Sequence, residues 1–450
     1  MKNLKRYFAA LTAALATLIL LAGCTEKSEP EANAQQVGYD PAAAVAPYLA
    51  NLPEMTEDDL NYTVQLGLFD CDHMVAALIG QDAGIYEALG MSVEVTMTNV
   101  VTSAVSAGQL DVAYANFIQS VLAYNSGASI VSLTGSHLGG ARYFVVRKGI
   151  EYLSHIESLT VSDASMTNPE WLRFAHELGI NNDYSAYEGA IMSQRDSLVA
   201  LRAGRIDGIF VCDPYASMAE EEDLGFIINV GWGSLSEELG IGWGQCCNPI
   251  FYKPFTQERP ALAARMVLAN YLATQYMYLH PYNAAMIFAD TFGTSPGVGL
   301  RTIFLKTNAE GRTMNWELTP QNLQNLIDYR IHWGVPESDW PQITRGETED
   351  FFDLSFEEMI GLKSFEEFEY EHGLAERFPI GMSYTDWLHM AETVDGIPHD
   401  SPVGKGLEKW MSGEFITFLH YSPDMVLSPR VGQPFVPPET DLSPAAGSRL

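Results

Sequence analysis

Cysteine and histidine are the residue types in this 450-residue chain that are best suited to metal or nucleophilic chemistry. Cys71 lies two positions before His73, Cys246 and Cys247 are adjacent, and Cys212 is isolated. No pair of these cysteines has the CxxC spacing of a structural zinc site. One or two disulfides are the simplest expectation in an exported protein. Adjacent cysteines rarely pair with each other, so Cys246 and Cys247 would need other partners, and the sequence assigns none.

These five side chains leave a second interpretation open. Cys71, His73, Cys212, Cys246 and Cys247 could converge on one site and hold a soft metal ion. We rank this interpretation below the one that the family resemblance described later implies, under which we expect no catalytic residue, no enzymatic activity, no cofactor and no bound metal. The soft-metal site is kept as the alternative.

The composition limits the possible functions. Hydrophobic residues make up 47% of the chain, which excludes a disordered protein, and the length allows two or three domains. Acidic residues outnumber basic ones by 57 to 25, which gives a net charge of −32. Nucleic-acid binders need a basic surface, so no nucleic acid is expected as a partner. We interpret the acidic excess as a solvated surface that keeps the protein soluble.

The N-terminus has the pattern of a secretion signal. Lys2, Lys5 and Arg6 precede an apolar run over 8–23, which is shorter than the roughly 20 residues of a transmembrane helix. The run ends in Leu-Ala-Gly-Cys24, which resembles a bacterial lipobox and implies cleavage before Cys24 and its acylation. The alternative is an ordinary signal in which this cysteine is incidental. We predict a signal peptide over 1–23 and a flexible lipid-anchored tether over 24–60, because the latter is rich in Ala, Pro, Glu and Gln.

The body of the chain alternates between strand and helix patterns. This alternation predicts an α/β fold with a mostly parallel, covered sheet in each of two lobes. The expected strands are 62–68, 92–97, 110–114, 129–133, 141–146, 159–161, 206–211, 226–230 and 249–252. The expected helices are 72–89, 100–107, 117–124, 168–178, 193–203 and 257–279, the last with one apolar face.

The predicted domains follow from this pattern. Lobe 1 is expected to comprise 61–147 and 248–341, and lobe 2 to comprise 148–247, with a cleft between them. A C-terminal helical extension is expected over 342–431, where Ser355 and Ser364 each precede a glutamate by three residues and so predict two capped helices. Its carboxylates could hold a hard cation, but exposed helix faces are the simpler interpretation. A Pro-rich disordered tail is expected over 432–450.

Four segments, in order, resemble the bacterial solute-binding proteins of the nitrate/sulfonate/taurine transporter family. They are the strand before His73 with Gln-Asp-Ala-Gly-Ile-Tyr-Glu-Ala-Leu-Gly-Met-Ser-Val-Glu at 81–94, Ser-Ala-Gly-Gln-Leu-Asp-Val-Ala at 106–113, 197–208 followed by Asp213-Pro214, and 248–264. The resemblance implies a type II periplasmic-binding fold that delivers a small solute to an ABC permease in the membrane. It also implies a monomer held on the extracytoplasmic face of the cell membrane by its lipid anchor.

The family shares its fold with the pyrimidine-synthesising proteins of thiamine biosynthesis, which form the competing interpretation. The eukaryotic-type enzymes of that group carry a cysteine-rich iron motif at about the place of 245–249. Only two of its cysteines are matched here, and those enzymes are not exported lipoproteins. A thiamine-pyrimidine-synthase-like protein is therefore the alternative function.

The resemblance also suggests which residues line the cleft, because in this fold solutes lie at strand ends and helix N-termini. Arg195 is the clearest basic candidate, whereas several aspartates lie near strand ends, which favours a neutral or cationic organic solute. For each aromatic candidate the alternative is core packing, and for each aspartate it is helix capping. The candidates are Phe69, Asp70, His73, Asn116, Phe117, Gly135, Ser136, His137, Asp163, Met166, Ser193, Arg195, Asp213, Tyr215, Trp232 and Trp243.

Overall fold

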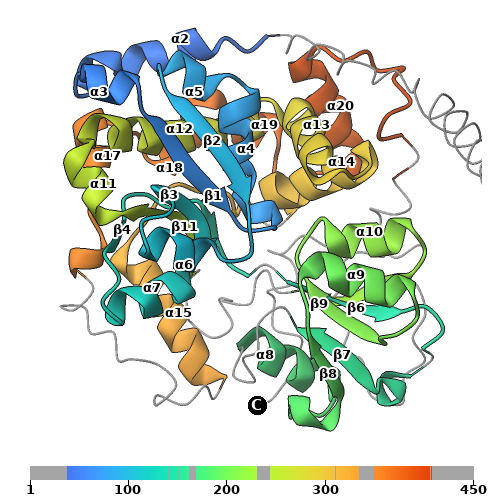
Figure 1. Ribbon diagram of the computed structural model, residues 1–450. Coiled ribbons are helices and arrows are strands. Elements are labelled where there is room, and N and C mark those ends of the chain that lie inside the picture. The colour runs from blue at the N-terminus through green and yellow to red at the C-terminus, as the bar shows by residue number, and fades with distance from the viewer. Residues whose placement is uncertain are drawn as a thin grey trace, which may run out of the picture. The chain divides into compact units, whose positions relative to one another are not determined.

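The computed structural model describes residues 38–140, 142–150, 152–161, 169–230, 244–309, 311–333, 349–405 and 407, all within one compact unit, Gly38–Leu450. Within these ranges the chain forms two β-sheets, each covered by helices (Figure 1). The predicted α/β class is confirmed. The expectation of mostly parallel sheets is wrong, because both sheets are mixed and five of the nine strand pairs among the described residues run antiparallel. Among the described helices, none is long and apolar enough to cross a membrane.

The first sheet has the strand order β2-β1-β3-β11-β4, with β5 paired to β11. Its first three strands run parallel, and β11 runs antiparallel to each of its partners. The sheet is built from β1 (Thr63–Leu68), β2 (Ser92–Met97), β3 (Val112–Asn116), β4 (Ile130–Ser132), β5 (His137–Leu138) and β11 (Gln245–Tyr252). Alternation predicted β1 and β2 well, because in β1 Val64, Leu66 and Leu68 lie buried on one face.

Short helices connect these strands. They are η2 (Asp72–Met74), α4 (Val75–Asp82), α5 (Ile85–Ala88), α6 (Val101–Ser106) and α7 (Phe117–Asn125). The single helix expected over 72–89 is therefore wrong. It breaks at Gly84, whose φ of 73° lies in the left-handed region that ends a helix.

The second sheet has the order β10-β6-β9-β7-β8. Its strands are β6 (Tyr143–Arg147), β7 (Ser158–Val161), β8 (Glu188–Ile191), β9 (Gly208–Val211) and β10 (Gly225–Val230). Its helical segments are η3 (Leu153–His155), α8 (Pro169–Leu178), η4 (Tyr184–Ala186), α9 (Gln194–Arg202) and α10 (Tyr215–Glu221). Phe144, Trp171, Phe174 and Phe210 form its aromatic core. The chain passes between the sheets twice, after β5 and after β10.

The C-terminal half consists of helices that follow β11. They are α11 (Lys253–Glu258), α12 (Pro260–Leu279), α13 (Pro281–Phe292), α14 (Pro296–Phe304), the π-helical segment η6 (Leu305–Ala309) and α15 (Pro320–His332). The expectation of one apolar face for the long helix is wrong, because 17 of the 20 residues of α12 are buried. Its polar side chains find internal partners. Arg265 donates to three backbone carbonyls, and Asn270 bonds Tyr114 Oη and the Gly135 carbonyl.

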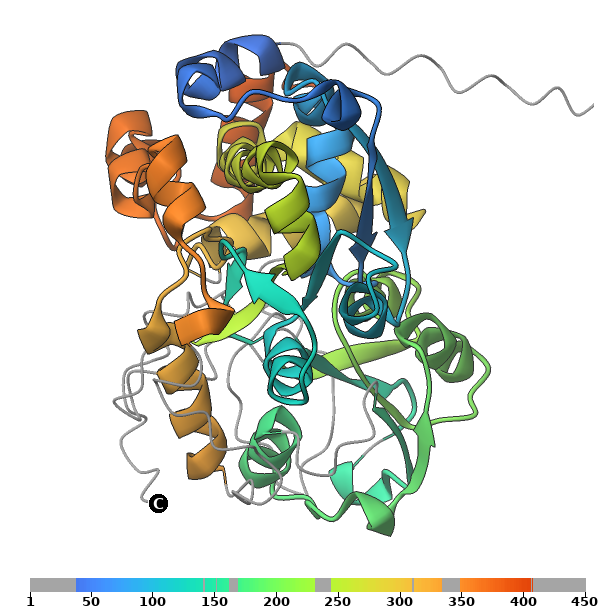
Figure 2. The same cartoon turned by 60° about the vertical axis from the view of Figure 1, so that its left-hand side comes forward.

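Further helices follow in the predicted C-terminal extension, shown in orange and red in Figure 2. They are η8 (Glu349–Phe351), α17 (Ser355–Ile360), α18 (Phe365–His372), α19 (Leu374–Arg377) and α20 (Tyr384–Asp395). Ser364 caps α18 in a reciprocal capping box, as predicted. Ser355 does not cap α17, because it is the first residue of that helix and its hydroxyl donates to Asp353.

The predicted flexible tether is wrong over its C-terminal part. Residues from Asp40 onward form α2 (Pro41–Val45), η1 (Ala46–Asn51) and α3 (Glu57–Leu60). Val45 and Leu52 are buried in the main hydrophobic core, and Asp59 pairs with Arg259 at 3.1 Å. The Ala- and Pro-rich composition suggested a tether, but Pro41 at a helix start and the caps Asp40 and Thr56 specify short helices.

Candidate functional site

Asp70 and Tyr215 connect the carboxyl ends of strands from the two sheets. Asp70 follows β1 by two residues, and Tyr215 begins α10 after β9. Tyr215 Oη donates to the Asp70 carboxylate, 2.5 Å from each oxygen. Burial raises the pKa of Asp70, whereas the Tyr215 hydrogen bond and the Arg195 charge oppose this rise. Arg195 is exposed and hydrogen-bonds Tyr215, so its guanidinium is engaged within this group.

Gln194 adds a second connection between the sheets. Its side-chain amide donates to the Asp70 carbonyl, and its Oε1 accepts from the Cys212 backbone N–H at 2.5 Å. The Asp72 backbone N–H also donates to the Asp213 carbonyl at 3.0 Å. We did not predict a role for Gln194, because an amide at the first turn of a helix gives no signal in the sequence.

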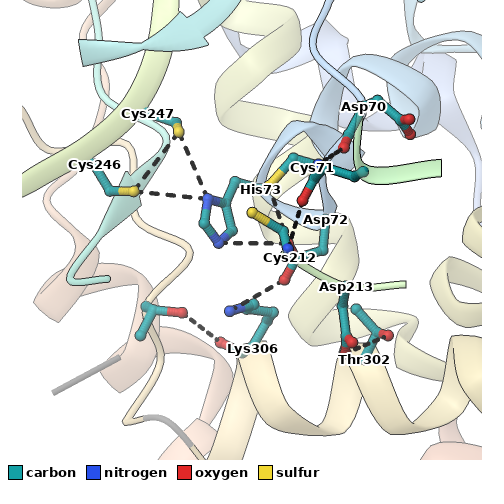
Figure 3. A network of polar contacts seen from close by, with 12 residues as sticks. Asp70, Cys71, Asp72, His73, Cys212, Asp213, Cys246, Cys247, Thr302 and Lys306 are labelled. Carbon is teal, nitrogen blue, oxygen red and sulfur yellow. Dashed lines mark hydrogen bonds and ion pairs between the residues drawn. The ribbon is translucent and has the colours of Figure 1, made fainter. Parts of the chain in front are cut away.

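Two buried histidines form the centre of the site. His73 and His137 stack with their ring centroids 3.7 Å apart and an interplanar angle of 10°. His73 Nδ1 lies 3.7 Å from Cys246 Sγ and 3.6 Å from Cys247 Sγ (Figure 3). Burial lowers the pKa of both histidines well below its usual value, so both rings are neutral at pH 7. Within the described residues, neither nitrogen of His137 has a hydrogen-bond partner.

A buried ion pair supports this centre from the other side. Lys306 Nζ on η6 lies 3.1 Å from Asp72 Oδ2, and both side chains are at most 1% exposed. Asp72 Oδ1 accepts from Cys71 Sγ at 3.2 Å and lies 3.5 Å from His73 Nε2. Lys306 Nζ also lies 5.9 Å from the centre of the Tyr143 ring on β6. No sequence signal indicated Lys306, which lies beyond the segments of the family resemblance.

This arrangement offers two kinds of chemistry. The neutral imidazoles and thiols around His73 are ligands for a soft or borderline cation. The group of Asp70, Tyr215 and Arg195 offers polar contacts to a small solute. A third cluster, His389, Glu392 and His399, is exposed apart from Glu392, which already binds Lys405 Nζ at 2.7 Å.

The sequence of the chain matches a known protein family. Residues 60–289 match the profile of the NMT1-like family, which is half of the chain and includes strands of both sheets. The chain belongs to the NMT1-like family. The predicted membership is thus confirmed. No curated protein sequence matches the chain.

Solved structures show the fold of this NMT1-like chain. A zinc-bound ligand-binding component of an ABC-type import system from Staphylococcus aureus is 15% identical, with a TM-score of 0.51 over 66% of this chain and 98% of that one. A protein of Bordetella bronchiseptica RB50 is 15% identical, with a TM-score of 0.54 over 70% and 99%. The periplasmic nitrate-binding protein NrtA of Synechocystis PCC 6803 is 12% identical, with a TM-score of 0.51 over 71% and 92%. The predicted periplasmic-binding-protein fold is confirmed.

Six of the predicted site residues meet at this junction. Besides the Asp70–Tyr215 contact and the histidine stack, Asp213 is fully buried and its carboxylate accepts from the Ser217 amide and hydroxyl and from Thr302 at 2.9–3.2 Å. These bonds give Asp213 a structural role. The residues brought together are Asp70, His73, His137, Arg195, Asp213 and Tyr215.

Other predicted residues of the NMT1-like chain have local structural roles. Asn116 caps α7 by accepting from the Gln119 N–H at 3.1 Å, and Ser193 caps α9 by accepting from the Asp196 N–H at 3.1 Å. Phe117 is buried against Phe351 in the hydrophobic core, which was the alternative to a role in the cleft.

The remaining predicted residues lie beside the junction or outside the described ranges. Phe69 is half-buried against the first sheet's core. Gly135 approaches the backbone closely, since a Cβ there would lie 2.5 Å from the Glu317 carbonyl oxygen. Ser136 is buried, and its hydroxyl has no partner among the described residues. Asp163, Met166, Trp232, Trp243 and Cys24 lie outside the described residues.

One pattern in the chain resembles a hydrolase nucleophile elbow. Gly-Thr-Ser-Pro-Gly at 293–297 has the G-x-S-x-G spacing. The structure excludes that role, because Ser295 connects two helices and not a strand and a helix. Its hydroxyl caps α14 by accepting from the Val298 N–H at 3.1 Å and donates to Glu221.

Proposed function

We propose that this chain is the extracytoplasmic solute-binding component of an ABC importer. In this role it captures a small organic solute between its two sheets and delivers it, chemically unchanged, to a membrane permease. The observation that carries the proposal is the NMT1-like match over 60–289, which includes strands of both sheets and both passages between them. The import-system and nitrate-binding proteins that share the fold support the same role.

The solute site is proposed at the strand ends where Asp70 and Tyr215 meet. A solute that breaks the Asp70–Tyr215 hydrogen bond, or that bonds to both side chains, would couple its binding to the distance between the two sheets. Arg195 is exposed but hydrogen-bonded to Tyr215, and Asp70 contributes a carboxyl group. A carboxyl group together with an arginine that is already hydrogen-bonded favours a neutral or cationic organic solute over an oxyanion.

Native mass spectrometry of the purified chain tests this proposal by identifying a co-purifying small molecule. A thermal-shift panel of amines, pyrimidines, sulfonates and nitrate follows, since a ligand at 100 times its Kd adds about 2.7 kcal/mol to stability. Tyr215→Phe should weaken binding of the stabilising compound at least tenfold, whereas Ser193→Ala, which removes only a helix cap, should leave its affinity within twofold. Turnover of the compound, or equal affinities of the two variants, would contradict the proposal.

Export and lipid anchoring belong to the same proposal. The lipobox resemblance at Cys24 supports a lipoprotein on the extracytoplasmic face of the cell membrane, and the family resemblance supports a monomer. Mass spectrometry of the mature N-terminal peptide should find a diacylglycerol-modified Cys24 and no residues before it. In Cys24→Ser the protein should leave the membrane fraction. An unmodified Cys24 in membrane-bound protein would refute the anchor.

A further inference from the structure

We propose that Cys246 Sγ, Cys247 Sγ and His73 Nδ1 bind one Zn²⁺ ion in a tetrahedral site with one open position. The proposal goes beyond solute capture and does not depend on it. Its first support is that three donors, from two segments 173 residues apart, converge in the interior of the protein (Figure 3). Cys247 and His73 are buried, and Cys246 is half-buried, which leaves a route for an ion to enter.

The spacing of the donor atoms fits such an ion. A tetrahedral Zn²⁺ with Zn–S bonds of about 2.3 Å and a Zn–N bond of about 2.0 Å separates two sulfurs by about 3.8 Å and sulfur from nitrogen by about 3.5 Å. The two sulfurs lie 3.7 Å apart, and they lie 3.7 and 3.6 Å from His73 Nδ1. The three atoms thus form one face of a coordination tetrahedron.

The strand that carries the cysteines is irregular at this point. Successive side chains of a regular strand point to opposite faces, so adjacent cysteines would diverge. In β11 the pairing register with β5 shifts between Gln245 and Cys247. Such an irregularity redirects a side chain and is common beside functional sites. It lets both sulfurs reach the same nitrogen of His73.

The second nitrogen of the histidine faces a carboxylate, although it makes no hydrogen bond within the described residues. Metal-bound histidines usually donate their other N–H to a carboxylate, which fixes the ring and its tautomer. His73 Nε2 lies 3.5 Å from Asp72 Oδ1, and Asp72 is in turn held by Lys306 at 3.1 Å. With its proton on Nε2, the ring directs the Nδ1 lone pair at the two sulfurs.

Charge favours a dication. Two thiolates and a neutral imidazole around Zn²⁺ have no net charge, so the site would bury no uncompensated charge. Binding would release the two thiol protons to solvent. The fourth position would be taken by water or by a donor atom of the solute.

Cobalt(II) is the probe that tests the site, because it replaces Zn²⁺ in tetrahedral thiolate sites and gives them colour. The full chain, purified under reducing conditions and stripped with a chelator, should bind one equivalent of Co²⁺. The spectrum should show intense visible bands of a tetrahedral ion and thiolate charge-transfer bands, and Zn²⁺ should bleach both. Metal analysis after Zn²⁺ addition and desalting should give one Zn²⁺ per chain.

Variants identify the ligands. Cys246→Ser, Cys247→Ser and His73→Ala should each weaken Co²⁺ binding at least tenfold, and the two serine variants should lose charge-transfer intensity. Cys212→Ser, which removes a buried thiol outside the triad, should bind within twofold of the unmodified chain. Near-ultraviolet circular dichroism of the metal-free proteins checks folding, and the half-buried Cys246 carries the test if a buried variant misfolds.

The proposal fails if the reduced chain binds no Co²⁺ or binds it with an octahedral spectrum, since the contacts would then be thiol–imidazole hydrogen bonds only. It also fails if Cys246→Ser binds like the unmodified chain or if Cys212→Ser is as weak as the triad variants. None of these results bears on solute capture, which the thermal-shift panel measures separately.

Discussion

The buried Asp72–Lys306 pair should be strongly coupled energetically. The charged atoms are 3.1 Å apart, and both side chains are at most 1% exposed. At an effective dielectric constant of about 20, their attraction is about 5 kcal/mol. Removing one partner leaves the other charge buried without it, which costs about 3–5 kcal/mol. We therefore expect Asp72→Asn and Lys306→Met each to lower the free energy of unfolding by that amount.

A double-mutant cycle measures the coupling. In Asp72→Asn/Lys306→Met neither charge remains, so the loss should fall below the sum of the two single losses by about 3 kcal/mol. Urea unfolding followed by tryptophan fluorescence is the assay, because Trp171, Trp316 and Trp387 are buried. A chelator is present throughout, so that metal binding does not contribute.

An exposed pair provides the matched control. Lys148 and Asp223 also form an ion pair, but their side chains are 61% and 76% exposed. Their cycle, with Lys148→Met and Asp223→Asn, should give a coupling below about 1 kcal/mol. If the Asp72 and Lys306 losses add to within about 0.5 kcal/mol, the buried pair does not act as described and the reasoning is refuted.

Three further predictions concern the C-terminal helices and their contacts. Ser364→Ala should cost about 1 kcal/mol in urea unfolding because it removes a cap, whereas Ser355→Ala should cost less than about 0.5 kcal/mol; equal losses would contradict the cap assignment. Burial raises the pKa of Glu357 to about 7, so the folded state holds a proton that the unfolded state loses near pH 4.5, and stability falls as the pH rises from about 4.5 through 7. Glu357→Gln has no carboxyl group to titrate, so this pH-dependent loss of stability should be absent from the variant. The free energy of unfolding of the variant minus that of the unmodified chain should therefore rise by about 2 kcal/mol between pH 5 and pH 8. If the two free energies change in parallel with pH, the pKa shift of Glu357 is refuted. Gly135→Ala should lower the thermal midpoint of unfolding by several degrees, because the added Cβ would lie 2.5 Å from the Glu317 carbonyl oxygen. An unchanged midpoint would contradict this and show that the backbone around Gly135 shifts to accommodate the Cβ without cost.

Local patterns in the sequence predicted much of the fold. The alternation of Val64, Leu66 and Leu68 and the cap at Ser364 are local signals, and the structure confirms the strand and the helix start. The break at Gly84 is also local, but an apolar period on both sides concealed it. Helix α12 was misjudged for a different reason: its partners lie on every side, and only the assembled protein reveals them.

The site was predictable only in part. Strand ends of an α/β fold drew attention to Asp70, His73, His137 and Tyr215, and these do meet. Lys306 lies on a helix more than 230 residues from Asp72 in the sequence, and no spacing pattern in the sequence indicates that the two side chains meet. The convergence of the adjacent cysteines depends on a register shift, which is set by the partner strand and not by the cysteines themselves.

Strand β11 has a consequence for the order in which the polypeptide can mature during synthesis. It lies between β3 and β4, yet it leaves the ribosome only after the entire second sheet. Until then β3 and β4 present bare edges, which are prone to pair with other chains. A fragment truncated after β10 should therefore aggregate. Neither sheet with its helices can be isolated as an independently folding domain by a single truncation of the chain.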